Sequence, residues 1–419
     1  MKIAIVGMGY VGLPLALRFV RAGASVLGVD VDAAKCAALN SGQSYIKHVS
    51  AATVAQARGA ALLEATADFS RIREVEAILL CVPTPLTAQR EPDMTYVFGT
   101  GESVAPHLRK GQLVVLESTT YPGTTDTDLR AILERGSGLV AGRDFHLAFS
   151  PEREDPGNGL LDAQKIPKIV GGLTPACRDR AVACYSLAVE SIVPVSSCRV
   201  AEAAKLLENI FRSVNIALVN ELKMVYTAMG IDIWEVIAAA KTKPFGFMPF
   251  YPGPGLGGHC IPIDPFYLTW KAREFGQHTR FIELAGEVNS AMPAYVVERA
   301  ATVLGRPLAG ARILLLGLAY KADVDDDRES PAYALMEMFE ARGADVAYHD
   351  PHVPVIRPTR EHPQFAGRQS QSLVPTGRDL AVLVTAHQEY RTFDFSAWPI
   401  PFVDTRNCAT RRPVQYFQA

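Results

Sequence analysis

Hydrophobic and polar positions along the first part of the chain predict strands and helices in alternation. Continuously apolar runs occupy residues 2–6, 25–29, 77–82, 113–117 and 146–149, and apolar positions with helical periodicity cover residues 13–22. Strands that are apolar at every position have both faces buried. This alternation therefore predicts a parallel sheet with helices on both of its faces.

From about residue 199 the pattern changes to long helices. They are expected at 200–229, 232–241 and 263–275, and from 280 through a helix started by Pro293 to 304. Strands return at 312–317, 345–348, 380–384 and 401–404, with a helix at 330–341 and an irregular surface loop at 353–375. The predicted fold is α/β, with two Rossmann-like doubly wound parallel-sheet domains joined by a central helical domain with one long helix. The expected boundaries are 1–195, 196–304 and 305–419.

Bulk composition excludes several classes of protein. The chain has 419 residues, 48% hydrophobic and 21% charged, with a mean hydropathy of +0.09 and a formal net charge of −2. It has no excess of basic residues of the kind that binds nucleic acid, and no apolar run approaches the roughly 18 residues that span a bilayer. It begins directly with a strand, which leaves no room for a signal peptide. We expect neither nucleic acid nor membrane as a partner.

Seven cysteines are scattered along the sequence without a CxxC spacing. Such an odd set suggests neither a disulfide framework nor a zinc site, and it fits a reducing cytoplasm. The histidines at 48, 259, 349 and 352 form no recognisable ligand cluster. We expect no metal.

Three glycines follow the first apolar run in the pattern GMGYVG, residues 7–12. The pattern lies between a strand and a helix, and Asp30 ends the next strand, so it is a strong dinucleotide fingerprint. Gly7 makes the turn, Gly9 admits the pyrophosphate, and Gly12 lets helix and strand pack closely. Asp30 can accept hydrogen bonds from a ribose diol and would repel a 2′-phosphate, which favours NAD over NADP.

A second glycine-rich stretch, residues 252–259, leads into Cys260, and Asp264 follows four residues later. A lone free cysteine is more often an inert core thiol. Glycines, however, let the backbone approach a ligand where a Cβ would clash. The flanking glycines and Asp264 favour a reactive thiol at residue 260.

Polar residues at the ends of the predicted strands and on the long helix are further candidates. Thr84, Ser118, Thr119 and Glu152 fall at the carboxyl ends of strands, where parallel sheets bind ligands. Each alone could be a turn residue or a helix cap, but four together favour a site. Lys205 and Asn209 lie on one helix face. Such a pair indicates either a solvent-exposed strip of the helix or a binding site in which both side chains have partners.

With these motifs in place, the chain resembles the UDP-glucose/GDP-mannose dehydrogenase family over essentially its full length. The resemblance rests on GMGYVGLP (7–14), EST (117–119), SPER (150–153), the Lys205-x-x-x-Asn209 pair, GGHC (257–260), and YK (320–321) followed by RESP (328–331). A UDP-N-acetylglucosamine 6-dehydrogenase subgroup is closest by SYIKH (44–48), EREDPG (152–157) and KPFGFMPFYPGPG (243–255). UDP-glucose dehydrogenases carry a different segment at 45–48 and a substrate-binding arginine in the loop before the cysteine. Residues 243–259 contain no arginine.

The resemblance implies a four-electron oxidation of the sugar C6 alcohol to a carboxylate by two NAD molecules in turn. Lys205, acting directly or through a water shared with Asp264, is the best candidate for the first base. Cys260 would add to the aldehyde and pass through a thiohemiacetal to a thioester. Lys205 and Asn209 would donate to the oxyanion. Glu152, Thr119 and Asp264 are the candidates to activate the hydrolytic water, with Glu152 ranked first.

The resemblance also implies two sets of binding residues. Those expected to contact the cofactor are Gly7, Gly9, Tyr10, Val11, Gly12, Asp30, Lys35, Thr84, Ser118, Thr119 and Arg328. Those expected to contact the UDP-sugar are Glu152, Arg153, Lys205, Asn209, Tyr251, Gly257, Lys321 and Arg406. The acetamido group is expected near 45–48 or 245–251, and the C-terminal domain is expected to hold the uridine diphosphate. A surface position of Arg406 is an equally good interpretation.

The expected substrate is UDP-N-acetylglucosamine, in the context of polysaccharide biosynthesis. The alternatives within the same chemistry are UDP-N-acetylmannosamine, UDP-N-acetylgalactosamine, UDP-glucose and GDP-mannose. A two-electron hydroxyacid-type dehydrogenase needs no thiolate, so Cys260 opposes it. A non-catalytic sugar-nucleotide sensor is opposed by the combination of Cys260, Lys205, Asn209 and Asp264. The long apolar helix predicts a homodimer or a higher homo-oligomer.

Overall fold

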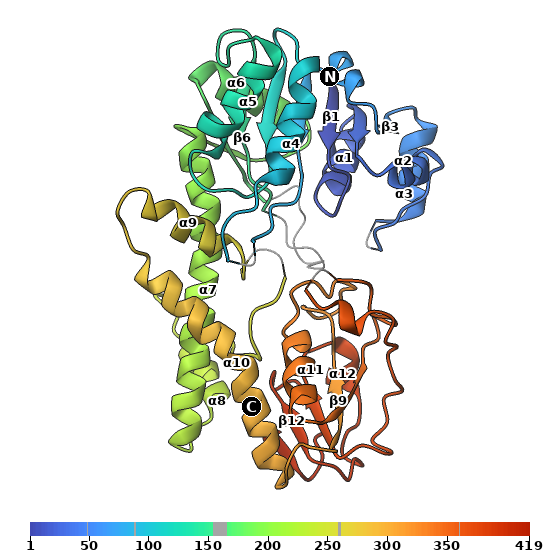
Figure 1. The fold of residues 1–419 in the computed structure, drawn as a ribbon, viewed down its shortest axis with the longest axis vertical. Coiled ribbons are helices and arrows are strands. Elements are labelled where there is room, and N and C mark those ends of the chain that lie inside the picture. Colours follow the sequence, from blue (N-terminus) through green and yellow to red (C-terminus); the bar gives the residue numbers. More distant parts are fainter. Residues whose placement is uncertain (48, 88, 154–165, 259–260, 360) are drawn as a thin grey trace. The chain divides into compact units, whose positions relative to one another are not determined.

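The computed structural model describes residues 1–47, 49–87, 89–153, 166–258, 261–359 and 361–419. The chain divides into two compact units, residues 1–208 with 266–277 and residues 209–265 with 278–419 (Figure 1). Two helices contribute residues to both units: α7 (Cys198–Ala228) and α9 (Asp264–Arg273). None of the described helices is both long enough and apolar enough to cross a membrane.

The first unit is built on an eight-stranded sheet in the order β3-β2-β1-β4-β5-β6-β7-β8. Its strands are β1 (Lys2–Val6), β2 (Ser25–Val29), β3 (Leu63–Thr66), β4 (Ala77–Leu80), β5 (Leu113–Leu116), β6 (His146–Phe149), β7 (Lys168–Gly172) and β8 (Ile192–Val195). The described pairs are parallel except β6 with β7, which is antiparallel. That pair departs from the all-parallel sheet that the sequence predicts.

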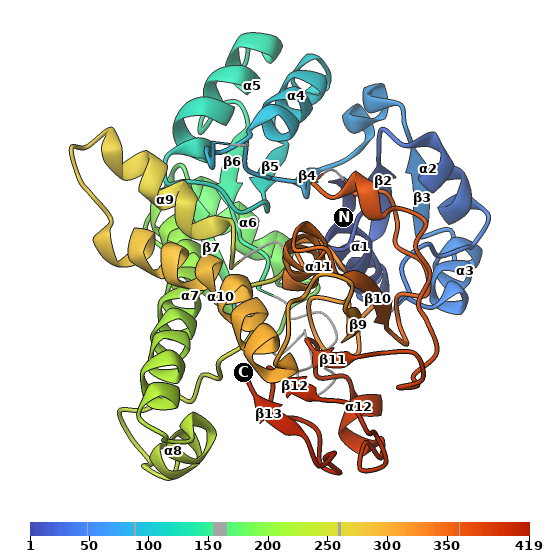
Figure 2. The same cartoon turned by 60° about the horizontal axis from the view of Figure 1, so that its bottom comes forward.

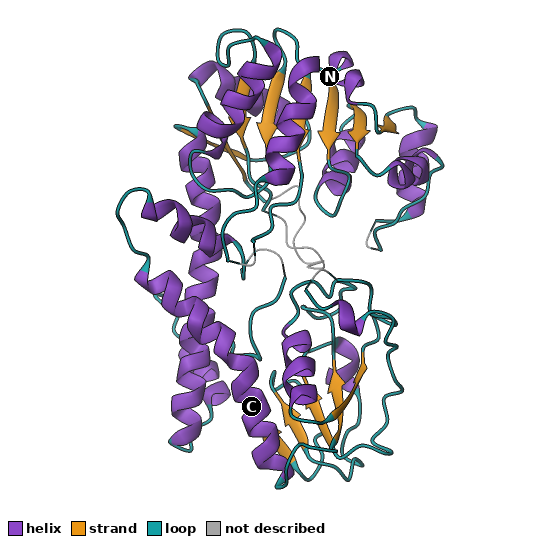
Figure 3. Ribbon diagram, in the orientation of Figure 1, coloured by secondary structure: helices purple, strands orange, loops and turns teal. Residues whose placement is uncertain are grey.

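Helices lie on both faces of this sheet (Figure 3). They are α1 (Gly12–Arg21), α2 (Ala33–Asn40), α3 (Ala51–Gly59), α4 (Thr95–Val104), α5 (Arg130–Ser137) and α6 (Pro175–Tyr185), with short helical turns η1 (Phe69–Glu74), η2 (Ala105–His107) and η3 (Thr124–Leu129). One core joins the α1 and α6 side to Ile3 and Ile5 of the central strand. The strand order reverses between β1 and β4, which is where doubly wound sheets bind their ligand.

The second unit combines helices with a five-stranded sheet in the order β10-β9-β11-β12-β13. Its elements besides α7 are α8 (Ile233–Ala240), α10 (Arg280–Leu304), β9 (Arg312–Leu316), α11 (Pro331–Ala341), β10 (Asp345–His349), η5 (Pro363–Phe365), β11 (Leu380–Leu383), α12 (Gln388–Thr392), β12 (Phe402–Asp404) and β13 (Tyr416–Gln418). Figure 2 shows the strands of this sheet between α11 and α12. Alternate residues of β9 serve opposite faces: Ile313 and Leu315 belong to the core with α10 and α11, and Leu314 and Leu316 belong to the core with Tyr390 of α12. This period of two is the geometry of a strand buried on both sides.

Two expectations for the second unit need correction. Pro293 does not start a new helix but lies inside the continuous helix α10, so the carbonyl of Asn289, one turn before it, lacks its usual amide donor. The 353–375 segment is irregular, but it is not merely a surface loop. Val353, Ile356 and Phe365 are buried in the core shared with α11, because the long connection covers an open side of that core.

Candidate active site

The glycine loop after β1 has the geometry of a dinucleotide cradle. Gly7 has a φ of +93°, and a Cβ there would collide with the carbonyl of Cys81 beyond β4. A Cβ at Gly12 would collide with the carbonyl of Gly7, whereas a Cβ at Gly9 would meet nothing within 4 Å. The space beside Gly9 is therefore open for a pyrophosphate, and the first turn of α1 offers backbone N–H groups to it.

Asp30, at the end of β2, is tied to this loop. Its carboxylate accepts hydrogen bonds from the amide of Met8 (2.9 Å) and the amide of Asp32 (3.0 Å). Each carboxylate oxygen has a further lone pair that can accept a ribose hydroxyl. Lys35 lies 3.8 Å from the same carboxylate. These residues fit the adenosine end of NAD.

Other predicted cofactor residues cluster at the carboxyl ends of β4 and β5. The hydroxyl of Ser118 accepts from the amide of Val82 (3.0 Å) and donates to the carbonyl of the same residue (2.7 Å). Thr84 and Thr119 are half-buried nearby in sequence, after the same two strands. On the loop itself, Val11 is exposed, and Tyr10 is half-buried.

A buried charge cluster lies behind Glu152 in the first unit. The ammonium of Lys168 is 2.6 Å from Glu117 and 3.5 Å from Glu152, and Tyr185 donates to Glu117. Burial would raise the pKa of Glu152, but the opposing attraction of Lys168, with smaller contributions from Arg18 and Lys205, leaves that pKa below its usual value. Glu152 is thus held as a carboxylate.

Two basic residues close to Glu152 in the sequence and the fold have different environments. Arg153 makes two hydrogen bonds to Glu208 of α7, at 2.6 and 3.3 Å. Lys205, also on α7, is buried, and no hydrogen bond joins its ammonium to another described residue. Of the two cations, Lys205 is the one available to a ligand.

In the second unit, the buried side chain of Asn209 donates a hydrogen bond to Asp264. Its amide oxygen accepts from Arg212. An amide nitrogen carries two hydrogens, so the bond to Asp264 leaves a second donor on Asn209. The guanidinium of Arg212 and the carboxylate of Asp264 together hold this amide in one orientation.

The glycine loop before residue 260 packs against the turn after β9. A Cβ at Gly257 or Gly258 would run into Tyr320, at 2.9 and 2.7 Å, so only glycine permits this close approach. Glu329, whose φ is +52°, places its carbonyl 3.3 Å from the same Gly257 position. His259 and Cys260 themselves lie outside the described residues, as do Glu154 and His48.

The remaining predicted substrate and cofactor residues of this unit are placed as follows. The guanidinium of Arg406 packs on Gly253 and donates to the carbonyl of Val384 (3.0 Å), so the interpretation of Arg406 as a surface residue is wrong. Arg328 forms two hydrogen bonds to Asp326, at 2.8 and 2.6 Å. Tyr251 stacks on Trp234 at 5.9 Å, and Lys321 is half-buried.

One cluster with metal-ligand chemistry lies apart from these motifs. Asp323, His352 and His387 present ligand atoms within 4.8 Å of one another. However, Nδ1 of His387 accepts from the amide of Asp323 (2.9 Å), and its Nε2 donates to Asp350 (3.1 Å). With both ring nitrogens engaged, His387 works as a structural tie, and the cluster is not a metal centre.

Sequence models of one family match the chain in three consecutive parts. The NAD binding domain of the UDP-glucose/GDP-mannose dehydrogenase family matches residues 1–189, the central domain matches 199–291, and the UDP binding domain matches 314–411. The chain belongs to this family. It is an NAD-dependent nucleotide-sugar dehydrogenase, and the predictions of family, fold class and cofactor are confirmed.

Named relatives act on different acetamido sugars. The chain is 35% identical to the UDP-N-acetyl-D-glucosamine 6-dehydrogenase of Pseudomonas aeruginosa over 93% of its length and 92% of the relative. It is 36% identical to the UDP-N-acetyl-D-mannosamine dehydrogenase of Escherichia coli (strain K12) over 80% of its length and 82% of the relative. The solved structure of the UDP-D-ManNAc dehydrogenase from Pyrococcus horikoshii matches with a TM-score of 0.89 and 30% identity, covering 100% of this chain and 99% of that one.

Sequence reasoning missed the residues that support the site from behind. Lys168 and Tyr185 were not among the candidates, and Glu117 and Tyr320 were noted only as parts of motifs. The sequence did contain a signal for Lys168. Glu117 is a carboxylate directly after a fully apolar strand, and a carboxylate in that position needs a buried partner. The sequence could not say that Lys168, 51 residues away, would be that partner.

Proposed function

We propose that this enzyme oxidises the C6 alcohol of UDP-N-acetylglucosamine to UDP-N-acetylglucosaminuronate. The observation that carries the choice of sugar is the 35% identity to the P. aeruginosa enzyme over 93% of the chain. Mannosamine dehydrogenases show either a narrower alignment, 80% of the chain, or a lower identity, 33% over 93% of the chain. The lack of an arginine in residues 243–258 opposes glucose. The same chemistry on UDP-N-acetylmannosamine or the galacto sugar is the second candidate.

For the first oxidation we assign the base to Lys205 and the orientation of the alcohol to Asn209 and Asp264. When bound, NAD supplies the acceptor for the hydride. Lys205 takes the hydroxyl proton as the C6–H bond breaks, which leaves an aldehyde. The buried position of Lys205 and its lack of a hydrogen-bond partner among the described residues support this role, because its amine is not engaged elsewhere in the described structure.

For the second oxidation we assign the nucleophile to Cys260. Its thiolate forms a C–S bond to the aldehyde carbon, and the carbonyl electrons move to oxygen as an oxyanion. Lys205 and the second amide hydrogen of Asn209 donate to that oxyanion. When the thiohemiacetal collapses, the C–H electron pair leaves as hydride, for which a second NAD would supply the acceptor, and a thioester remains. The glycines at 257 and 258, which pack on Tyr320, support a fixed approach of the loop.

For hydrolysis we assign the general base to Glu152, with Thr119 as a polar neighbour of the water. The base removes a proton from water, the resulting hydroxide attacks the thioester carbon, and the C–S bond breaks to release the Cys260 thiolate and the carboxylate. Because Lys168 keeps the pKa of Glu152 below its usual range, Glu152 is ionised and able to accept that proton at neutral pH.

We assign separate residues to the binding of the diphosphate and of the sugar of the UDP-sugar. Lys321 and Arg406 are proposed to contact the diphosphate and sugar from the C-terminal domain, with Tyr251, Gly257 and Arg153 bordering the sugar. Arg153 already pairs with Glu208, and Tyr251 already stacks on Trp234, which supports defined orientations for both. Arg328 is proposed to contact NAD, and the described cysteines, all unpaired, are consistent with work in the cytoplasm.

We further propose a homodimer formed through α7. Phe211, Leu218 and Val225 recur every seven residues and are 45%, 52% and 45% exposed. A seven-residue spacing keeps side chains on one face of a helix that packs on a second helix. Phe245, Phe247 and Met248 add exposed apolar surface. This amount of apolar surface is typical of a face that associates with a second copy.

A panel of sugar nucleotides tests the proposed substrate. The kcat/KM for NADH formation would be measured with UDP-N-acetylglucosamine, UDP-N-acetylmannosamine, UDP-N-acetylgalactosamine, UDP-glucose and GDP-mannose. We expect the gluco acetamido sugar to be preferred by at least about tenfold, because a site with a polar partner for the acetamido group leaves that partner unpaired with UDP-glucose. A kcat/KM for any other sugar equal to or above that value would overturn the assignment.

A further inference from the structure

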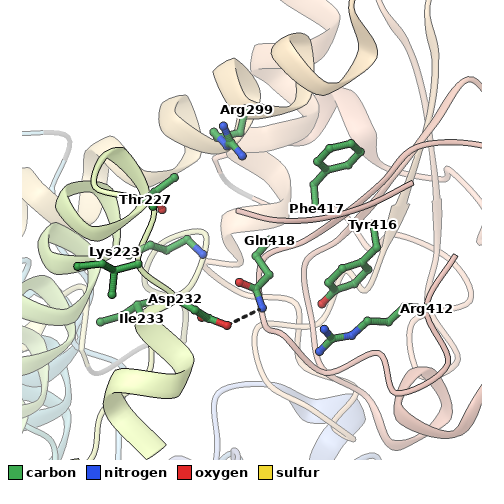
Figure 4. Close-up of a pocket in the computed structure, with 11 residues that line it drawn as sticks. Lys223, Thr227, Asp232, Ile233, Arg299, Arg412, Tyr416, Phe417 and Gln418 are labelled. Atoms are coloured by element: carbon green, nitrogen blue, oxygen red, sulfur yellow. Dashed lines mark hydrogen bonds between the residues drawn. The ribbon is translucent and has the colours of Figure 1, made fainter. Parts of the chain in front are cut away.

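A cavity of about 450 Å³ lies wholly within the second unit, and its lining contains none of the residues assigned above (Figure 4). Its wall comes from the last turns of α7, the start of α8, α10 and the end of the chain around β13. Cavities of a few hundred Å³ are the size that holds a small-molecule ligand. Three cationic side chains and one carboxylate line it: Lys223, Arg299, Arg412 and Asp232.

Lys223 is the central feature of this cavity. Its side chain is only 2% exposed, and Figure 4 shows its ammonium directed into the space between α7 and β13. It makes no hydrogen bond or ion pair with any described residue, and the nearest ring face is that of Trp234 at 5.7 Å. Burial lowers the pKa of Lys223 to about 8. A buried cation without a partner destabilises the fold. The presence of such a cation at Lys223 therefore favours the binding of an anionic ligand.

The other charges around the cavity do not neutralise Lys223. In the described parts of the chain, Nε of Arg299 is buried without a hydrogen-bond partner. Arg412 stacks on the ring of Tyr416 at 4.3 Å and donates to Asn407 at 2.8 Å. The carboxylate of Asp232 caps α8 by accepting from the amide of Trp234 at 2.8 Å.

Asp404 is a nearby acid outside the cavity lining, and its carboxylate also accepts hydrogen bonds from backbone amides. It accepts hydrogen bonds from the amides of Arg406, Cys408 and Ala409, at 2.8 to 3.0 Å, and from the hydroxyl of Tyr416 at 3.0 Å. Both acids attract Lys223 electrostatically, but neither forms an ion pair with it in the described residues. With Lys223, Arg299 and Arg412 set against Asp232 and Asp404, the surroundings of the cavity keep a net positive charge that favours an anion.

We propose that this cavity binds a small phosphorylated metabolite, with Lys223 and Arg299 as direct ligands of its phosphate. A phosphate group offers several acceptor oxygens and two negative charges, which match two unpartnered cations. The cavity is larger than a bare phosphate ion, and the Tyr416 and Gln418 side chains supply an apolar face and an amide for the organic part. None of the residues that line this cavity is among those proposed for sugar oxidation.

Isothermal titration calorimetry of the full chain tests the proposal. Ribose 5-phosphate and inorganic phosphate would be the probes at pH 7.0, with NAD and UDP present in excess so that the cofactor and nucleotide sites are filled. We expect one ribose 5-phosphate per chain, bound at least tenfold more tightly than inorganic phosphate. Lys223→Met removes a buried charge without removing its bulk, and it is expected to weaken binding at least tenfold.

Two further variants keep the test decisive. Arg299→Gln is expected to weaken binding as Lys223→Met does, and it serves if Lys223→Met fails to fold. Lys241→Met removes an exposed lysine of the same unit and is expected to leave binding unchanged. No ribose 5-phosphate binding by the wild type, equal binding by wild type and Lys223→Met, or binding of inorganic phosphate alone would each overturn the proposal.

Discussion

Single residues show which parts of the site local sequence can and cannot predict. Gly7, Gly9, Gly12 and Asp30 form the expected cradle because their roles depend on neighbours within one strand–turn–helix–strand unit. Arg406 was ambiguous in the sequence, because its packing on Gly253 joins segments about 150 residues apart. Partners of this kind are set by tertiary packing, which no local pattern encodes.

Lys168 is the residue on which the charge balance of the first unit depends. Lys168→Met would leave the buried Glu117 without its cation and would remove the strongest attraction on the half-buried Glu152. Breaking a buried pair in this way typically costs about 3–5 kcal/mol, so we expect a loss of that size in the free energy of unfolding measured in urea. We also expect the pKa of Glu152 to rise, because Lys168 is its main source of attraction.

A matched control is Lys2→Met, which removes a half-exposed ion pair with Glu74. Exposed pairs contribute about 1 kcal/mol or less. If both variants lost the same small free energy, the buried cluster would not have the role assigned to it.

At the scale of elements, the sequence predicted the positions of the helices better than their interruptions. Helix α7 begins and ends within two residues of its expected bounds, because its apolar periodicity extends over many turns. The prediction that a new helix begins at Pro293 was wrong, because tertiary packing of α10 on α11 outweighs the one hydrogen bond that proline removes. Helix α7 also carries Glu202, whose carboxylate accepts from the amides of Gly123 and Thr125 at 2.7 and 2.9 Å.

Glu202 gives the fold a defined pH dependence. Burial raises its pKa from 4.5 to about 7, so the folded chain retains a proton that the unfolded chain releases. This contribution to stability is fully present below pH 4.5 and is lost as the pH rises to about 7. One proton over this window corresponds to about 3 kcal/mol. Glu202→Gln should remove that dependence.

The measurement is the free energy of unfolding in urea at pH 5 and at pH 7.5. The wild type should lose about 2–3 kcal/mol more than Glu202→Gln between the two values. The control variant Glu221→Gln changes an exposed carboxylate of the same helix and should keep the wild-type dependence. An equal pH dependence in wild type and Glu202→Gln would contradict the assignment.

At the scale of the whole molecule, association is the first property to test. Leu218→Glu places a charge at the centre of the exposed seven-residue repeat on α7, and it should convert the proposed dimer to monomer in sedimentation velocity. Val414→Glu, at a site that is 97% exposed, should leave the dimer intact. A wild type that sediments as a monomer, or a Leu218→Glu variant that remains a dimer, would disprove this interface.

The number of NADH molecules formed per UDP-N-acetylglucosamine tests the central claim most directly. A cysteine thiol generally ionises far more readily than a serine hydroxyl, which supplies almost no alkoxide at neutral pH. We therefore predict two NADH and a carboxylate product for the wild type. Cys260→Ser should give at most one NADH, because its second oxidation has no nucleophile. One NADH from the wild type, or two NADH and the carboxylate from Cys260→Ser at nearly the wild-type rate, would contradict the account.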